Sequence, residues 1–161
     1  MRMYQAQFNS VTWAATTALD FFEVLAASGK PVAIHGFVLF QISDVGDAAE
    51  EILRLEEVRG FSTVTSGSGG STPTIYAKGR NDVAAGAVVE ANNTTRLATG
   101  TGTLQNMGQR GWNVRIPLEV IYTPEMRPII LPGEYWTIGM TNAGPVDALT
   151  GSGCIWFEEL A

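Results

Sequence analysis

The sequence predicts an all-β chain that folds as a two-sheet antiparallel sandwich, and three observations lead to this prediction. Runs of alternating apolar and polar residues recur along the whole 161-residue chain, as expected of half-buried strands. Proline and glycine punctuate these runs roughly every ten residues, the spacing typical of sandwiches and barrels. Charged residues make up only 16% of the chain, below the roughly 25% of an average soluble domain, as in many sandwiches. Jelly roll is the predicted topology.

The first part of the chain contributes three predicted strands. Residues 4–8 alternate strictly between apolar and polar side chains, which predicts the first strand. Residues 20–27 fit either a helix, which Gly29 and Pro31 would end, or a strand; the β-rich surroundings favour the strand. Residues 31–42 are apolar on both faces, as in a central strand covered on both sides.

The middle of the chain is predicted to hold shorter strands and one flexible loop. Alternation over residues 53–56 predicts a strand, and a slip of register at Glu57 and Val58 indicates a bulge. The run 66–71, composed of serine and glycine, predicts a flexible loop within the domain rather than a linker. Three short strands are expected at residues 74–77, 87–91 and 97–103.

Another long predicted strand spans residues 112–122. Its even-numbered positions are all apolar and most of its odd-numbered positions are polar, which indicates one half-buried strand. Further strands are expected at residues 129–131, 135–141 and 154–158. With no internal repeat and a length suited to one core, residues 1–161 are predicted to form a single domain.

Charge and hydropathy exclude several classes of partner. The net charge is −6 and the only lysines are Lys30 and Lys78, which argues against binding a nucleic-acid backbone. No apolar run reaches the ~18 residues that span a bilayer, and the first residues do not resemble a secretory signal, so synthesis in a cytoplasm is expected. The single cysteine, Cys154, forms no intrachain disulfide and is predicted to be a small buried residue rather than a reactive thiol.

His35 is the only histidine, and this limits the chemistry available. Its apolar strand predicts a hydrogen-bonded core or interface residue rather than a catalytic base. Cupin-like jelly-roll enzymes hold a metal with several imidazoles, which this chain lacks. Nucleophilic triads would have to pass through His35, and no nucleophile-elbow pattern is present. We therefore predict a protein that is not an enzyme, with no catalytic residue, cofactor or resident metal.

Two loops carry residues of the kind found in ligand sites. Asp44, Asp47, Glu50 and Glu51 could supply hard oxygen ligands for Ca²⁺, but they do not match an EF-hand loop, and solvated carboxylates are the preferred interpretation. The glycines of 67–70 lack the lysine and helix start of a phosphate-binding loop.

The four tryptophans allow two interpretations. Exposed tryptophans can stack on sugar rings, whereas buried ones belong to a core or a subunit interface. Trp112 lies on the apolar side of its predicted strand, and Trp136 shares a side with Ile138 and Met140. Core or interface positions are therefore expected.

Seven segments along the chain form a familiar set. They are PVAIHGF at 31–37, SDVGD at 43–47, EILRL at 51–55, RG at 59–60, SGSGGSTP at 66–73, YTPEMRP at 122–128 and GCIWFEE at 153–159. Together they resemble a family of small all-β proteins of tailed phages and prophages, and the resemblance covers nearly the full length. It implies a jelly-roll-like virion component, such as a capsid decoration protein, that binds other virion proteins such as the major capsid protein.

Apolar residues on both faces of several strands predict a homo-oligomer. Residues 129–131 have no polar member, and one sandwich does not easily cover so much apolar surface. In the central strand, one face is expected to hold Ile34, Val38, Phe40 and Ile42, and the other Phe37 and Leu39. Closed symmetric assembly buries such faces, and a trimer is preferred over a dimer because it matches capsid lattices.

The expected function is that of a non-enzymatic structural protein of a virus particle. Two alternatives stay open. A carbohydrate- or receptor-binding sandwich module would use exposed tryptophans and loop carboxylates. A hydrolase or lyase of unfamiliar type would need a deep pocket with convergent Asp, Glu and Arg side chains.

Overall fold

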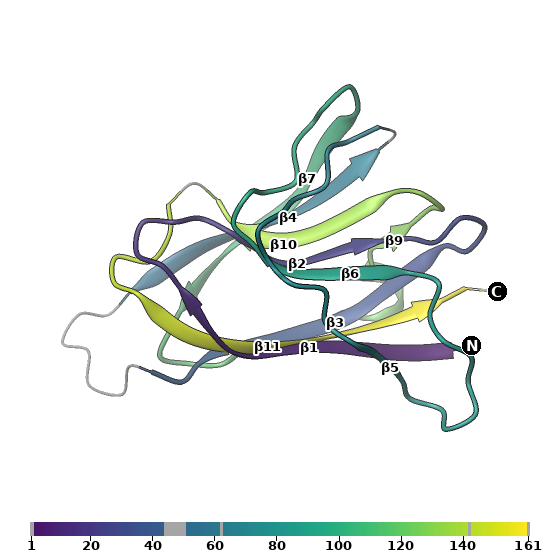
Figure 1. Cartoon of the computed structure of the whole chain (residues 1–161), viewed down its shortest axis with the longest axis horizontal. Coiled ribbons are helices and arrows are strands. Elements are labelled where there is room, and N and C mark those ends of the chain that lie inside the picture. Colours follow the sequence, from purple (N-terminus) through teal and green to yellow (C-terminus); the bar gives the residue numbers. More distant parts are fainter. Residues whose placement is uncertain (1, 44–50, 62, 142, 161) are drawn as a thin grey trace.

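A computed structural model of the chain shows two antiparallel β-sheets packed as a sandwich, which confirms the predicted fold class. It describes residues 2–43, 51–61, 63–141 and 143–160. Within these residues the only helical element is a single 3-10 turn, η1 (Pro124–Met126). The sandwich lies almost edge-on in Figure 1, with one sheet along the lower side of the molecule and the other above it. Jelly-roll connectivity stays a prediction.

The lower sheet has six strands. They are β1 (Arg2–Trp13), β3 (Val32–Gln41), β5 (Ile75–Ala77), β8 (Leu118–Ile121), β9 (Ile129–Ile130) and β11 (Leu149–Glu159). The order across the sheet is β5-β1-β11-β3-β8, and β9 pairs with the other end of the same edge of β3. Strand β11 therefore lies between β1 and β3, far from both in sequence.

The upper sheet has five strands in the order β6-β2-β10-β4-β7. They are β2 (Asp20–Leu25), β4 (Ile52–Phe61), β6 (Val88–Asn93), β7 (Thr103–Asn113) and β10 (Tyr135–Met140). Strand β2 confirms the choice of strand over helix for this segment. The register between β4 and β7 shifts at Glu57 and Val58, as predicted, but the extra residue is Met107 on β7, and β4 itself pairs without a break with β10.

Aromatic side chains fill the space between the sheets. Trp13 makes edge-to-face contacts with Phe21 and Trp112, with ring centroids 5.0 and 6.0 Å apart. Its indole Nε1 donates a hydrogen bond of 2.9 Å to the Asn92 side chain, so the buried polar atom is satisfied. Phe37 from the lower sheet contacts Trp136 from the upper sheet. Large aromatic groups thus join the two sheets through apolar burial.

The predicted long strand over residues 112–122 is wrong, because the chain leaves one sheet and enters the other there. Strand β7 ends at Asn113 and β8 begins at Leu118, in the opposite sheet. A turn joins them, with Ile116 N donating to Asn113 O and Trp112 Nε1 donating to Ile116 O. Pro117 lies at this turn and has no N–H for a ladder. Apolar and polar residues keep alternating through the turn because Trp112 and Val114 also pack into the core, from the side of the upper sheet.

Two smaller expectations also fail. Residues 97–103 do not form a strand: Ala98 makes one isolated bridge with Thr65, and Gly100 has a φ of 52°. In β3, Ile34 lies on the core side with Phe37 rather than opposite it. The cause is a bulge at His35, since Ile34 pairs with Phe157 and Gly36 pairs with Trp156.

Gly151 tests the packing between the sheets. A Cβ added at Gly151 would overlap the ring of the fully buried Trp13. We expect Gly151→Ala to lower the free energy of unfolding by about 1–3 kcal/mol through overpacking, measured by urea denaturation. Gly108→Ala in β7 is the matched control, because its new Cβ would meet no atom within 4 Å. Equal losses in both variants would contradict the packing described here.

Candidate functional site

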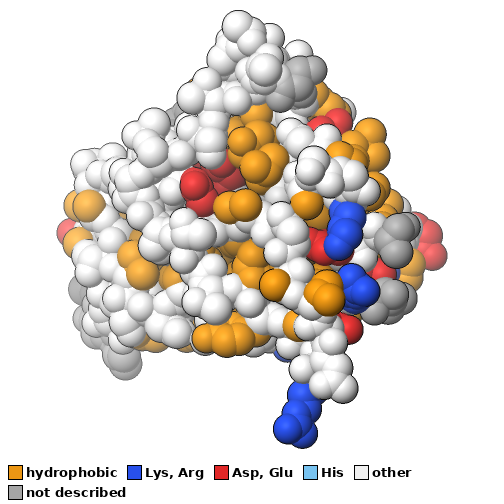
Figure 2. All heavy atoms as spheres, turned by 45° about the vertical axis from the view of Figure 1, so that its right-hand side comes forward, with side chains coloured by type: hydrophobic (Ala, Val, Ile, Leu, Met, Phe, Trp, Pro, Cys, Tyr) orange, Lys and Arg blue, Asp and Glu red, His pale blue; other side chains and the backbone are white. Residues whose placement is uncertain are grey.

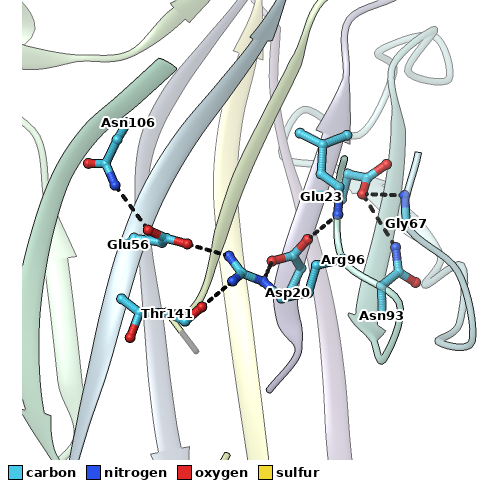
Figure 3. A network of polar contacts seen from close by, with 9 residues as sticks. Asp20, Glu23, Glu56, Gly67, Asn93, Arg96, Asn106 and Thr141 are labelled. Atoms are coloured by element: carbon cyan, nitrogen blue, oxygen red, sulfur yellow. Dashed lines mark hydrogen bonds and ion pairs between the residues drawn. The ribbon is translucent and has the colours of Figure 1, made fainter. Parts of the chain in front are cut away.

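Part of the outer face of the upper sheet, over β2, β10 and the adjoining part of β4, is covered by the protein's own chain. The segment that precedes β5 and the segment that follows β6 run together over this face. Bridges between Thr65 and Ala98 and between Ser68 and Thr95 join the two segments. Arg96 fixes the cover to the sheet (Figure 3). Its guanidinium donates to Asp20 Oδ1 at 2.9 Å on β2, and to Glu56 Oε1 at 2.7 Å on β4.

Gly139 makes room for this ion-pair network. It pairs with Asp20 on one side and with Glu56 on the other, so the guanidinium spans the strand that separates the two carboxylates. A Cβ at Gly139 would overlap the Asp20 carboxylate. Asp20 is almost fully buried and also accepts a hydrogen bond of 2.8 Å from Leu97 N. Burial raises the pKa of Asp20, and the bonds from Arg96 and Leu97 only partly offset this shift.

Glu23 anchors the second part of the cover. Its carboxylate accepts hydrogen bonds from the Ser66 hydroxyl and, at 3.0 Å, from Gly67 N, while Asn93 Nδ2 lies 3.5 Å away. Burial raises the pKa of Glu23, and the neighbouring Glu90 adds to the shift. The loop over 66–71 is thus tied to the sheet by hydrogen bonds, which differs from the flexible loop that the sequence predicted.

The outer face of the lower sheet is different, because apolar side chains remain uncovered there. We call this surface the apolar face, and it contains Val38, Phe40, Tyr76, Ile121, Ile129, Cys154 and Trp156. The residues next to these seven along each strand pack in or against the core, and side chains alternate between the two faces of a strand. The seven side chains therefore point outward. Ile121 is 71% exposed and Tyr76 is 54% exposed, and the central members are half-buried. In Figure 1 this face is the lower side of β1, β11 and β3.

The centre of the apolar face is a row across three strands. Trp156 on β11 and Ile121 on β8 both pair with Gly36, which lies between them on β3. A Cβ at Gly36 would overlap the carbonyl oxygen of Val120, so glycine permits the close approach of β8 to β3 at this row. Cys154 and Val38 form the next row, and Phe40 pairs with Ser152 in the row beyond.

The size of the apolar face suits a protein contact. The strands of the lower sheet contain 42 residues, and at about 3.3 Å per residue and about 4.8 Å between strands the outer side of the whole sheet, polar residues included, covers roughly 670 Å². This is about the area that each partner contributes to a stable protein interface. Figure 2 shows another side of the molecule, where hydrophobic groups lie between uncharged polar atoms and charged side chains are few.

His35 and Glu158 form the polar part of the apolar face. Their side chains meet at 2.9 Å between Nε2 and Oε2, with 17% and 7% of each side chain exposed. His35 is thus a hydrogen-bonded residue at a surface rather than in the core. Near them, Glu119 projects from β8 on the same side as Ile121, and Lys78 donates to the Gln5 side chain on β1.

The remaining candidates from the sequence are dispersed. Cys154 is half-buried rather than buried, and burial raises the pKa of its thiol. Asp44, Asp47 and Glu50 lie outside the described residues. Glu51 accepts a hydrogen bond from Val146 N. The described part of the chain contains no group of three or more His, Cys, Asp or Glu side chains placed to hold a metal ion.

The glycines of 67–70 do not form an anion site, since the hollow of about 180 Å³ beside them is lined by the carboxylate-bearing Glu90. Three tryptophans, Trp13, Trp112 and Trp136, lie in the core as expected, and Trp156 is partly exposed on the apolar face.

Among the described residues, no helix has the length and hydrophobicity required to cross a membrane. Comparison with protein-family models, curated proteins and solved structures finds no match to this chain. The resemblance to phage virion proteins therefore stays a prediction.

The Arg96 network was not predicted from the sequence. Arg96 lies 76 residues from Asp20 and 40 residues from Glu56 along the chain. No local spacing signals such a network, because only the pairing of β2, β10 and β4 brings its carboxylates together.

The Arg96 network yields a prediction for stability. Arg96→Ala leaves Asp20 buried without its cation, and we expect the free energy of unfolding to fall by about 3 kcal/mol. Urea denaturation measures this change. Arg54→Ala serves as control, because exposed Arg54 makes a hydrogen bond of 3.4 Å to Gln109. A loss no greater than that of the control would show that Arg96 does not anchor the cover.

Glu23 yields a prediction for pH dependence. Because its pKa is raised in the folded protein, the stability gained from the protonated form is lost as pH rises through that pKa. We expect the Tm of the natural protein, relative to that of Glu23→Gln, to fall as the pH rises above 4.5, the ordinary pKa of glutamate. The exposed carboxylate of Glu125 provides a control through Glu125→Gln. The opposite trend would mean that Ser66 and Gly67 outweigh the effect of burial.

Proposed function

We propose that the protein is a non-enzymatic structural component of a virus particle, of the capsid-decoration kind, and that it self-associates through the apolar face. The apolar face carries this proposal. Part of the upper sheet is covered by its own chain through Arg96 and Glu23, whereas Trp156 and Ile121 of the lower sheet have no such cover among the described residues. Exposed apolar patches of this size usually mark protein interfaces.

A second copy of the chain is the proposed occupant of the apolar face. The outer side of the lower sheet, roughly 670 Å², falls within the range that one partner contributes to a stable complex. The surface is mostly apolar at its centre and polar at its rim, where Glu119 and Gln7 are exposed, as in protein interfaces. A trimer is the proposed assembly, since it would match the local symmetry of a capsid lattice.

The proposal of a non-enzymatic role rests on how the buried carboxylates are used. Asp20 and Glu23 hold the cover of the upper sheet. Glu57, facing the interior, accepts bonds from Arg110 at 2.6 Å and from the Tyr122 hydroxyl. Each carboxylate is therefore engaged in holding strands or segments together.

One feature favours the alternative of a carbohydrate- or receptor-binding module. A hollow of about 320 Å³ lies between the turn after β1 and the end of β6, and Asn92 lines it. Asn92 has a φ of 59°, and among the described residues its buried side-chain Nδ2 has no hydrogen-bond partner. Strained backbone and unpaired polar groups are enriched at functional sites.

Self-association is tested by light scattering coupled to gel filtration at micromolar concentration. We expect a mass three times the 17.2 kDa of one chain, and we expect Ile121→Glu to give the monomer mass. Ile52→Glu is the matched control, because Ile52 is 67% exposed on the other sheet. A monomeric natural protein, or an Ile121→Glu variant that keeps its mass, would contradict the proposal and favour the binding module.

The virion assignment is tested by the genes that flank the coding sequence. Neighbouring genes for capsid or portal proteins would support it. A neighbourhood of metabolic genes would contradict it, although self-association through the apolar face would be unaffected.

A further inference from the structure

We propose that self-association through the apolar face takes up a proton at the pair formed by His35 and Glu158, so that mild acid tightens the oligomer. This inference rests on the proposed function, because it concerns the regulation of the same surface. It makes the strength of the proposed contact depend on pH through the side chains of His35 and Glu158.

The pair is built into the apolar face by a bulge. His35 is the extra residue of β3, between Ile34 and Gly36, and its carbonyl oxygen accepts a hydrogen bond of 2.9 Å from Tyr122 N. Glu158 follows Phe157 on β11 and lies on the opposite side of the sheet from that core residue. The contact at 2.9 Å between Nε2 and Oε2 therefore lies beside the row of Trp156, Gly36 and Ile121.

Apolar groups surround the pair. Ala33 pairs with Glu158 on one side and with Ile129 on the other. Trp156 lies two residues from Glu158 on the same side of β11. A second copy that covers Trp156 and Ile129 would thus also remove the remaining contact of the pair with water, which is 17% of the His35 side chain and 7% of the Glu158 side chain.

Other charged groups on the neighbouring elements also bear on this pair. Glu119 projects from β8 onto the same face, and Lys78, after β5, donates to Gln5. The connection from β8 to β9, which forms backbone hydrogen bonds with His35 and Ile34 of β3, carries Glu125 and Arg127. Of these groups, only His35 and Glu158 are shown in direct contact with each other, and they lie beside the central row of the apolar face, toward the end of β11.

Removing water from the pair is less favourable for one of its two protonation states than for the other. With a neutral imidazole the pair has a net charge of −1, because Glu158 alone is ionised. With an imidazolium the pair has no net charge and gains a charge-assisted hydrogen bond. Removing an uncompensated carboxylate from water is much less favourable than removing a matched ion pair. Association therefore favours the protonated pair.

Linkage converts this preference into a pH dependence. If association takes up protons, the association constant rises as pH falls, by at most about tenfold per pH unit for each proton taken up. Histidine is the side chain whose ordinary titration falls between pH 5 and 8. We expect the midpoint concentration of dissociation to be about tenfold lower at pH 5.5 than at pH 8.

The experiment compares the natural protein with His35→Gln and Glu158→Gln by analytical ultracentrifugation at both pH values. His35→Gln keeps a donor for Glu158 but cannot titrate, so its association should lose most of the pH dependence. Glu158→Gln leaves His35 without an anionic partner, so acid should now weaken association. Circular dichroism at both pH values checks that each variant is folded. A His35→Gln variant that retains the full pH dependence overturns the inference.

The outcomes separate this inference from the proposed function. An oligomer that Ile121→Glu dissociates, but whose affinity is equal at both pH values, overturns the proton uptake and keeps the apolar face. An oligomer that Ile121→Glu leaves intact overturns the proposed surface itself. A chain that stays monomeric at both pH values overturns both.

Discussion

The ion pairs of Arg96 are the interaction on which the covering of the upper sheet depends. The segment that carries Arg96 offers few apolar side chains, with Leu97 the main buried one, so hydrophobic burial alone does not hold it on the sheet. Instead, one guanidinium joins carboxylates of β2 and β4 across Gly139. Such a network depends on each of its members, because removing one charge leaves another buried without a partner. The ion pairs of Arg96 therefore fix the position of the cover more tightly than apolar contact alone would.

The two sheets differ in how their outer faces are covered, and this difference underlies the proposed function. On the upper sheet, polar side chains such as Asp20 and Glu23 are buried beneath a segment of the same chain. On the lower sheet, Trp156 and Ile121 lie outward over Gly36. A contact between copies through the lower sheet would bury apolar atoms at its centre, with His35 and Glu158 as its polar element.

The sequence predicted local features well and long-range ones poorly. Alternation with a period of two is a local property, so most strands, including the ambiguous segment at 20–27, were identified. The turn at 114–117 was missed because apolar side chains reach the same core from both sheets. The bulge at His35 depends on pairing with β11, and with it the orientation of Ile34. The contact of His35 with Glu158 and the Arg96 network likewise join residues far apart in sequence, which periodicity cannot reveal.

The position of β11 between β1 and β3 has a consequence for biosynthesis. Both neighbours are translated long before β11, yet neither pairs with the other, so each waits with an unpaired edge. Sheets closed by such distant pairings form slowly, and their open edges invite pairing with other chains in the meantime. During translation on a polysome, neighbouring nascent chains expose the same edges at the same time. Productive folding thus requires β11 to reach the gap before a neighbouring chain does.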